Sequence, residues 1–125
     1  MSIELGNVTL DCDDPGTVAT FWSAALDLPV DDGGSEFFVS IGMHDTSRPG
    51  WFFIKVPEGK TAKNRVHLDI RVAGREVRGE ERKRLVSEKV ERLAQAGASI
   101  AWVSDIFGGN SITMRDPEGN EFCVS

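Results

Sequence analysis

The strongest constraint on the fold is an order of elements that occurs twice along the chain, at a spacing of about 60 residues. Residues 3–12 and residues 65–72 each alternate apolar and polar side chains, which indicates a strand with one buried face. Each stretch is followed by a helical pattern of apolar residues and then by short strand-like runs. This repetition predicts an α+β fold in which one domain contains two tandem βαβββ modules, over about residues 1–58 and 64–125.

Local signals give the limits of the two helices. Asp14 before Pro15 predicts a helix start, because an Asp side chain caps the first turn and proline fits its first position. That helix is expected to end near Pro29. A second helix is predicted over residues 76–96, with Gly97 as its stop. The other predicted strands are residues 28–30, 36–41, 51–56, 99–103, 111–115 and 122–124.

Composition and charge argue against several classes of partner. The 125 residues include 14 Lys and Arg against 20 Asp and Glu, which gives a formal net charge of −6. Nucleic-acid binding draws its affinity from clustered cations, so we expect no nucleic-acid partner. No apolar run approaches the ~20 residues of a membrane-spanning helix, and the first residues lack the pattern of a signal peptide. We therefore expect a cytoplasmic protein without a membrane partner.

The polar faces of the predicted strands are the first candidate site. The apolar face of each opening strand is expected under the helix of its own module, so the polar residues point the other way. If the two mixed, mainly antiparallel sheets curl around a shared cleft, these residues converge there, as in most small-molecule sites. The same alternation is also typical of sheet faces that simply contact water. The residues concerned are Asn7, Thr9, Asp11, His67, Asp69, Arg71, Glu121, Cys123 and Ser125.

A run of three aromatic residues is the candidate apolar surface of this cleft. Trp51 and Phe53 point to one face of their strand and Phe52 points to the other. We predict that Trp51 and Phe53 contact the ligand, although ordinary sheet packing explains the run equally well. Cys123 is expected on the cleft wall and Cys12 in the core.

His67 and Glu121 are the candidate catalytic residues. Imidazole titrates near neutrality, so His67 can act as a metal ligand or a general base, and Asp69 can orient its ring. Burial in a partly dry cleft would raise the pKa of Glu121, which suits a general base. The alternatives are that His67 is a hydrogen-bonded strand residue and that Glu121 pairs with Arg115 across a hairpin.

Two loops carry further expectations. The link between the modules concentrates positive charge, which can attract an anionic ligand or simply solvate the linker. Its cations are Lys55, Lys60, Lys63 and Arg65. Residues 105–110, DIFGGN, contain adjacent glycines and can act as a lid or as a plain loop.

Three stretches resemble the vicinal oxygen chelate superfamily, which comprises the glyoxalase, bleomycin-resistance and extradiol-dioxygenase proteins. They are NVTLDCDDPGTVATFWSAAL, VPEGKTAKNRVHLDI and ITMRDPEGNEFCV. The middle stretch resembles a bacterial glyoxalase-like subfamily whose members mostly lack an assigned reaction. The resemblance implies paired βαβββ modules around a cleft and a homodimer.

The resemblance also implies where a metal would bind. The ligand positions of metal-dependent members correspond to Asn7, His67 and Cys123. A neutral amide and a soft thiol do not suit the hard divalent ions of those enzymes, so we expect no metal and no other cofactor. We predict that the cleft binds a small aromatic or conjugated metabolite. The alternative is one divalent ion, held by His67 and Glu121, in a lyase, isomerase or dioxygenase acting on vicinal oxygens.

Overall fold

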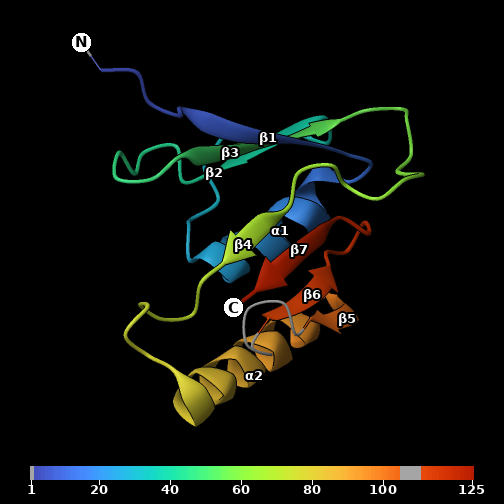
Figure 1. Ribbon diagram of the computed structural model, residues 1–125. Coiled ribbons are helices and arrows are strands. Elements are labelled where there is room, and N and C mark those ends of the chain that lie inside the picture. The colour runs from blue at the N-terminus through green and yellow to red at the C-terminus, as the bar shows by residue number, and fades with distance from the viewer. Residues whose placement is uncertain (1, 105–110) are drawn as a thin grey trace. The chain divides into compact units, whose positions relative to one another are not determined.

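A computed structural model describes residues 2–104 and 111–125, and the chain forms two compact units, Met1–Gly59 and Lys60–Ser125. Each unit combines one helix with one mixed sheet, which confirms the α+β class (Figure 1). The first unit contains β1 (Asn7–Cys12), α1 (Pro15–Leu26), β2 (Phe38–Ile41) and β3 (Gly50–Lys55). The second contains β4 (Leu68–Ile70), α2 (Gly79–Gln95), β5 (Ser99–Ser104), β6 (Ser111–Arg115) and β7 (Glu121–Val124). No helix in the described ranges is long and apolar enough to cross a membrane.

The sheet of the first unit has the strand order β1-β3-β2, with β1 parallel and β2 antiparallel to β3. Helix α1 covers one face of this sheet, where the Trp22 ring stacks on the Trp51 ring with 5.1 Å between their centroids. The predicted helix start is confirmed, because the Asp14 side chain accepts a hydrogen bond from the Thr17 backbone N–H at 3.2 Å.

Two strand predictions in the first unit are wrong. Strand β1 begins at Asn7 rather than at Ile3, because its partner β3 begins opposite it at Gly50 and offers no ladder to earlier residues. The strand predicted for residues 28–30 is reduced to an isolated bridge between Val30 and Ile41. Within the described residues the first unit therefore has the order βαββ.

The second unit has the predicted order βαβββ, and its strands lie in the order β4-β7-β6-β5. Helix α2 places its apolar stripe against β5, β6 and β7. The buried side chains of this interface include Val86, Val90, Leu93, Met114, Phe122 and Val124. The helix begins at Gly79, later than predicted, because Arg78 is extended. It ends as predicted before Gly97, whose φ of 121° lies in the region that favours glycine.

Candidate functional site

The face of the second sheet that lies opposite α2, here called the polar face, carries three of the predicted site residues, Asp69, Glu121 and Cys123. Directly opposite residues on neighbouring strands point to the same face. Asp69, Cys123, Thr113 and Trp102 form one such row across β4, β7, β6 and β5. The Thr113 hydroxyl lies 3.4 Å from the Cys123 thiol. Glu121 lies two residues before Cys123 on the same strand and so points to the same face.

Trp102 is a candidate site residue that the sequence analysis missed. The register of β5 against β6 shifts between Ile100 and Trp102, so that Ile100 lies opposite Met114 and Trp102 lies opposite Thr113. Without this irregularity the alternation of the strand would turn Trp102 to the face covered by α2. The shift instead exposes 39% of Trp102 on the polar face. The broken alternation of residues 100–103, Ile-Ala-Trp-Val, is the signal that could have predicted it.

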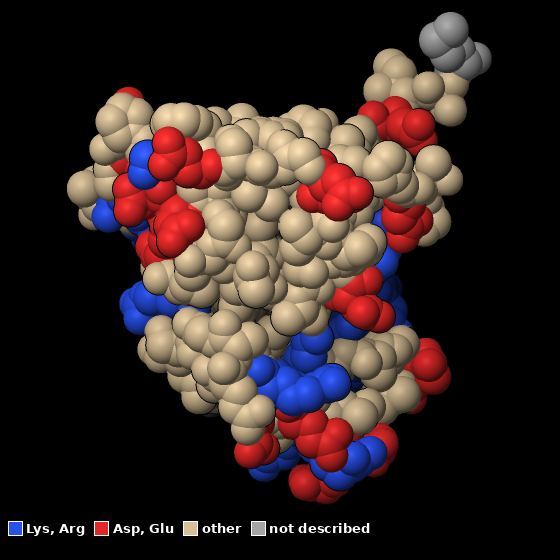
Figure 2. All heavy atoms as spheres, turned by 180° about the vertical axis from the view of Figure 1, so that it is seen from behind, with Lys and Arg blue, Asp and Glu red and all other residues tan. Residues whose placement is uncertain are grey.

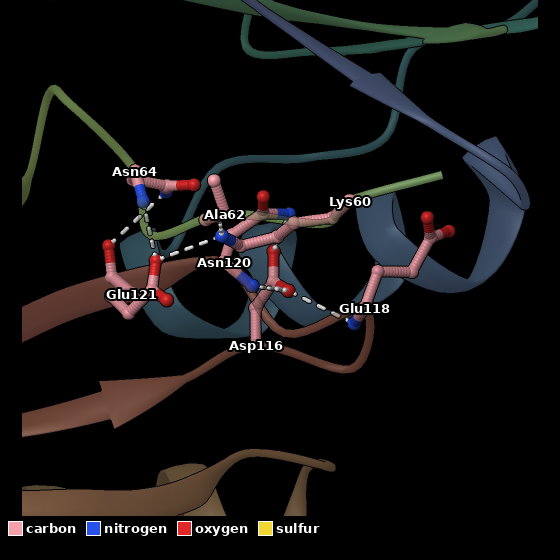
Figure 3. Close-up of polar contacts among 7 residues, drawn as sticks. All are labelled: Lys60, Ala62, Asn64, Asp116, Glu118, Asn120 and Glu121. Atoms are coloured by element: carbon pink, nitrogen blue, oxygen red, sulfur yellow. Dashed lines mark hydrogen bonds and ion pairs between the residues drawn. The ribbon is translucent and has the colours of Figure 1, made fainter. Parts of the chain in front are cut away.

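Glu121 is fixed by groups that precede β4 (Figure 3). Its Oε2 atom accepts a hydrogen bond from the Asn64 backbone N–H at 2.9 Å and lies 3.1 Å from the Lys60 Nζ atom. Burial, which leaves Glu121 only 7% exposed, raises its pKa, but the hydrogen bonds and the Lys60 charge outweigh burial and lower the pKa overall. The predicted raised pKa is therefore wrong, and Glu121 pairs with Lys60 instead of Arg115.

A buried carboxylate shapes the turn that leads into β7. Asp116, only 4% exposed, accepts hydrogen bonds at 2.9 Å from the backbone N–H groups of Glu118 and Asn120 and from the Asn120 side chain (Figure 3). These bonds fix the backbone immediately before Glu121. The motif DPEGN thus serves to position the start of β7 and the carboxylate at its first residue.

A cavity of about 420 Å³, here called the Trp102 pocket, opens beside the indole ring. Its lining includes Lys60, Lys63, Trp102, Arg115 and Glu121. The Lys63 Nζ atom lies 5.1 Å from the centre of the Trp102 ring, which is the geometry of a cation–π contact. The lining contains three cations, Lys60, Lys63 and Arg115, against two carboxylates, Glu118 and Glu121, so the pocket has an excess of one positive charge.

The structure places Trp51 and Phe53, the predicted ligand contacts, on the face of β3 that α1 covers. Both side chains are buried under α1, where they pack as core residues of the first unit. The opposite face carries Phe52, which lies across from Thr9. The centroids of the Phe52 and Phe38 rings are 5.2 Å apart. The aromatic surface of that face is therefore provided by Phe52 and Phe38.

The remaining predicted residues divide between the units. Asn7 and Thr9 share a face of β1, and the Asn7 amide donates to the Thr9 hydroxyl at 3.1 Å. His67 directly precedes β4 and is exposed. Its side chain makes no hydrogen bond to another residue in the described ranges. A shared cleft between the two sets stays a prediction, and the predicted lid at residues 105–110 lies outside the described residues.

The donor chemistry of the two proposed ligand sets is poorly suited to a hard divalent ion, and the metal-free expectation stays a prediction. Of the residues that the structure describes, no three His, Cys, Asp or Glu side chains are grouped so that they could hold an ion. The Oε2 atom of Glu121 is engaged by Lys60 and Asn64, and the Cys123 thiol lies beside the Thr113 hydroxyl. Hard divalent ions prefer several oxygen ligands, whereas the amide of Asn7, the imidazole of His67 and the thiol of Cys123 offer one neutral oxygen, one nitrogen and one sulfur.

Comparison with family models identifies the domain that the chain contains. The model of the glyoxalase-like domain matches residues 7–125. The chain belongs to the glyoxalase-like domain family. Among curated proteins, no significant match to the sequence was found.

Solved structures share the fold of this glyoxalase-like protein at low sequence identity. A glyoxalase/bleomycin resistance protein/dioxygenase family enzyme from Burkholderia phytofirmans PsJN has a TM-score of 0.73 and 17% identity, over 98% of this chain and 97% of that chain. A possible glyoxalase from Bacillus cereus has a TM-score of 0.70 and 15% identity, over 98% of both chains. The fosfomycin resistance protein FosX from Listeria monocytogenes, in a mutant form complexed with Mn(II) and 1S,2S-dihydroxypropylphosphonic acid, has a TM-score of 0.71 and 14% identity, over 99% of this chain and 90% of that chain.

Proposed function

We propose that this glyoxalase-like protein binds a small, conjugated, anionic metabolite in the Trp102 pocket, without the metal triad of the metal-dependent relatives. The observation that carries the proposal is the irregular register of β5, which turns the Trp102 indole to the polar face beside Lys63 and Arg115. Bulges of this kind often re-aim a side chain near a functional site.

The chemistry of the pocket favours a planar ring that carries a negative charge. The indole face offers a stacking surface for a conjugated ring. Lys63 and Arg115 supply charge-assisted hydrogen bonds to a carboxylate or a similar anion. Glu121 completes the pocket without repelling such a ligand, because its charge is already paired with Lys60 at 3.1 Å.

The alternative of a divalent-metal enzyme requires the Glu121 carboxylate as a ligand. Coordination would place a divalent cation close to the Lys60 ammonium group, which lies 3.1 Å from the carboxylate. Repulsion between the two cations opposes metal binding. This donor chemistry supports the metal-free proposal over the metal-dependent one.

The proposal is tested with a ligand that has the expected chemistry, such as cinnamate, in isothermal titration calorimetry. We compare the wild type with Trp102→Leu, which keeps an apolar side chain but removes the aromatic face, and with Trp102→Phe, which keeps a ring. Removing the stacking surface is expected to weaken binding about tenfold or more, and Trp102→Phe should retain most of the affinity. Equal affinity of the wild type and Trp102→Leu, or no binding by any of a panel of aromatic carboxylates, would overturn the proposal.

A further inference from the structure

A second cavity, of about 500 Å³, lies in the second unit at the other end of the polar face. It is here called the arginine pocket, and its lining includes Arg71, Arg75, Arg78, Arg82, Ser111 and Ser125. It shares no lining residue with the Trp102 pocket. Ser125 and Glu121 are four residues apart on and just after β7, so the two pockets are separated by about 13 Å along the strand.

The four arginines have no ion pair with a carboxylate in the part of the chain that the structure describes. Arg84, two residues after Arg82 on α2, shows the usual alternative, with contacts of 2.6 Å to both Glu81 and Glu88. The surrounding surface mixes the two signs, and Figure 2 shows Lys and Arg side chains adjoining one another near the lower middle of the view. Neighbouring cations repel one another, and an anion that binds among them relieves this repulsion. The anion is therefore bound more favourably than it would be by a single arginine.

Backbone contacts hold the pocket in shape before any ligand binds. The Arg82 side chain donates from Nε to the Val77 carbonyl at 2.7 Å and from Nη2 to the carbonyls of Ala73 and Gly74. Arg82 therefore fixes the segment that leads into α2. The guanidinium groups of Arg71 and Arg75 donate no hydrogen bond to a described residue. A rigid pocket loses less conformational entropy when a ligand binds.

The start of α2 adds a partial positive charge to the same pocket. Gly79, the first residue of the helix, lines the cavity, and the preceding Arg78 provides no side-chain cap for the first turn. Uncapped N–H groups at a helix start attract anions. Acidic residues also lie close by: Glu76 packs over Gly74, and Glu80 and Glu81 belong to the first turn of the helix. The four arginine charges, together with the uncapped first turn, outnumber these three carboxylates.

We propose that the arginine pocket binds the phosphate or pyrophosphate group of a small phosphorylated molecule. Guanidinium groups match phosphate oxygens with paired hydrogen bonds, and the Ser111 and Ser125 residues add hydroxyl donors at the wall of the cavity. The limited volume of the cavity and the acidic charge of the whole chain favour a small phosphate compound over a nucleic-acid strand.

The experiment titrates inorganic pyrophosphate into the full chain by isothermal titration calorimetry. Arg71→Gln and Arg75→Gln each remove one charge from the pocket without disturbing Arg82. Arg84→Gln is the matched control, since it also removes one arginine charge from the second unit, but at a residue that does not line the cavity. Each pocket variant is expected to weaken binding about tenfold or more, whereas the Arg84→Gln affinity should stay within about twofold of wild type.

Two further measurements locate the binding site. On addition of pyrophosphate, the backbone amide signals of Arg75 and Gly79 should shift in nuclear magnetic resonance spectra, and the Trp102 indole signal should not. Trp102→Leu should bind pyrophosphate normally, which separates this proposal from the proposed function. The proposal is overturned if wild type does not bind pyrophosphate, if Arg84→Gln weakens binding as much as the pocket variants, or if a single-stranded oligonucleotide binds more tightly through the same arginines.

Discussion

At the scale of single residues, Glu121 shows how local contacts decide the chemistry of a carboxyl group. Burial alone would raise the pKa of Glu121 and so bring it closer to the neutral pH at which a general acid or base works best. The Asn64 backbone N–H and the Lys60 ammonium group instead favour the carboxylate and lower the pKa. Glu121 therefore acts as an ionised anchor between the start of β7 and the segment before β4.

This assignment predicts a specific loss of stability in acid. A carboxyl group whose pKa is lowered by folding stabilises the folded state above its ordinary pKa, here 4.5, and loses that contribution as the pH falls through the folded-state pKa. The free energy of unfolding of the wild type should thus fall below pH 4.5 more steeply than that of Glu121→Gln. Urea denaturation at neutral pH and at two lower values measures the difference.

The matched control for this experiment is Glu88→Gln, which removes a carboxylate from an exposed ion pair on α2. Such exposed pairs contribute little to stability, so Glu88→Gln should keep the acid-dependent loss of the wild type. If wild type and Glu121→Gln show the same pH dependence, the Lys60 and Asn64 contacts do not stabilise the Glu121 carboxylate.

At the scale of elements, strand register decides which aromatic residues can meet a ligand. In β3 the regular alternation turns Trp51 and Phe53 under α1 and leaves Phe52 on the opposite face. In β5 one irregular position turns Trp102 away from α2. A register shift of one residue thus decides whether an aromatic side chain lies in the core or at the site. Such a shift does not alter the amino-acid composition of the strand.

The two faces of β3 predict different costs for the same substitution. Phe53 is fully buried, so Phe53→Ala should lower the free energy of unfolding by about 3–5 kcal/mol through lost burial and the cavity that remains. Phe52 is only half-buried, so Phe52→Ala, its neighbour in the same strand, should cost less than about 1.5 kcal/mol. Chemical denaturation of both variants makes the comparison. A larger loss for Phe52→Ala would reverse the assignment of the core face.

At the scale of the whole molecule, the chain is an acidic protein whose cations are concentrated rather than spread evenly. The net charge is −6, yet the Trp102 pocket and the arginine pocket of the second unit are both lined by Lys or Arg. Local charge of this kind attracts anionic ligands although the total charge is negative. The homodimer implied by the family resemblance stays a prediction.

The metal-free proposal predicts how the folded chain responds to metal. A ligand that binds only the folded state raises the melting temperature, and removing that ligand lowers it. We therefore expect the same melting temperature with and without a chelator, no rise with added Mn(II), and no stoichiometric metal by elemental mass spectrometry. One tightly held divalent ion per chain, lost in His67→Ala, would instead establish the metal-dependent alternative.

The sequence by itself determined the α+β class, the βαβββ order of the second unit and the start of α1 at the Asp14 cap, because alternation, helical spacing and capping depend on neighbouring residues. It also placed Asp69, Glu121 and Cys123 on one face of the second sheet, since strand parity is local. Only the tertiary structure decided that Glu121 pairs with Lys60, that Trp51 and Phe53 are core, and that Trp102 faces the pocket. Each of these outcomes depends on which segment lies beside another and in which register, and such long-range pairing leaves little trace in local sequence.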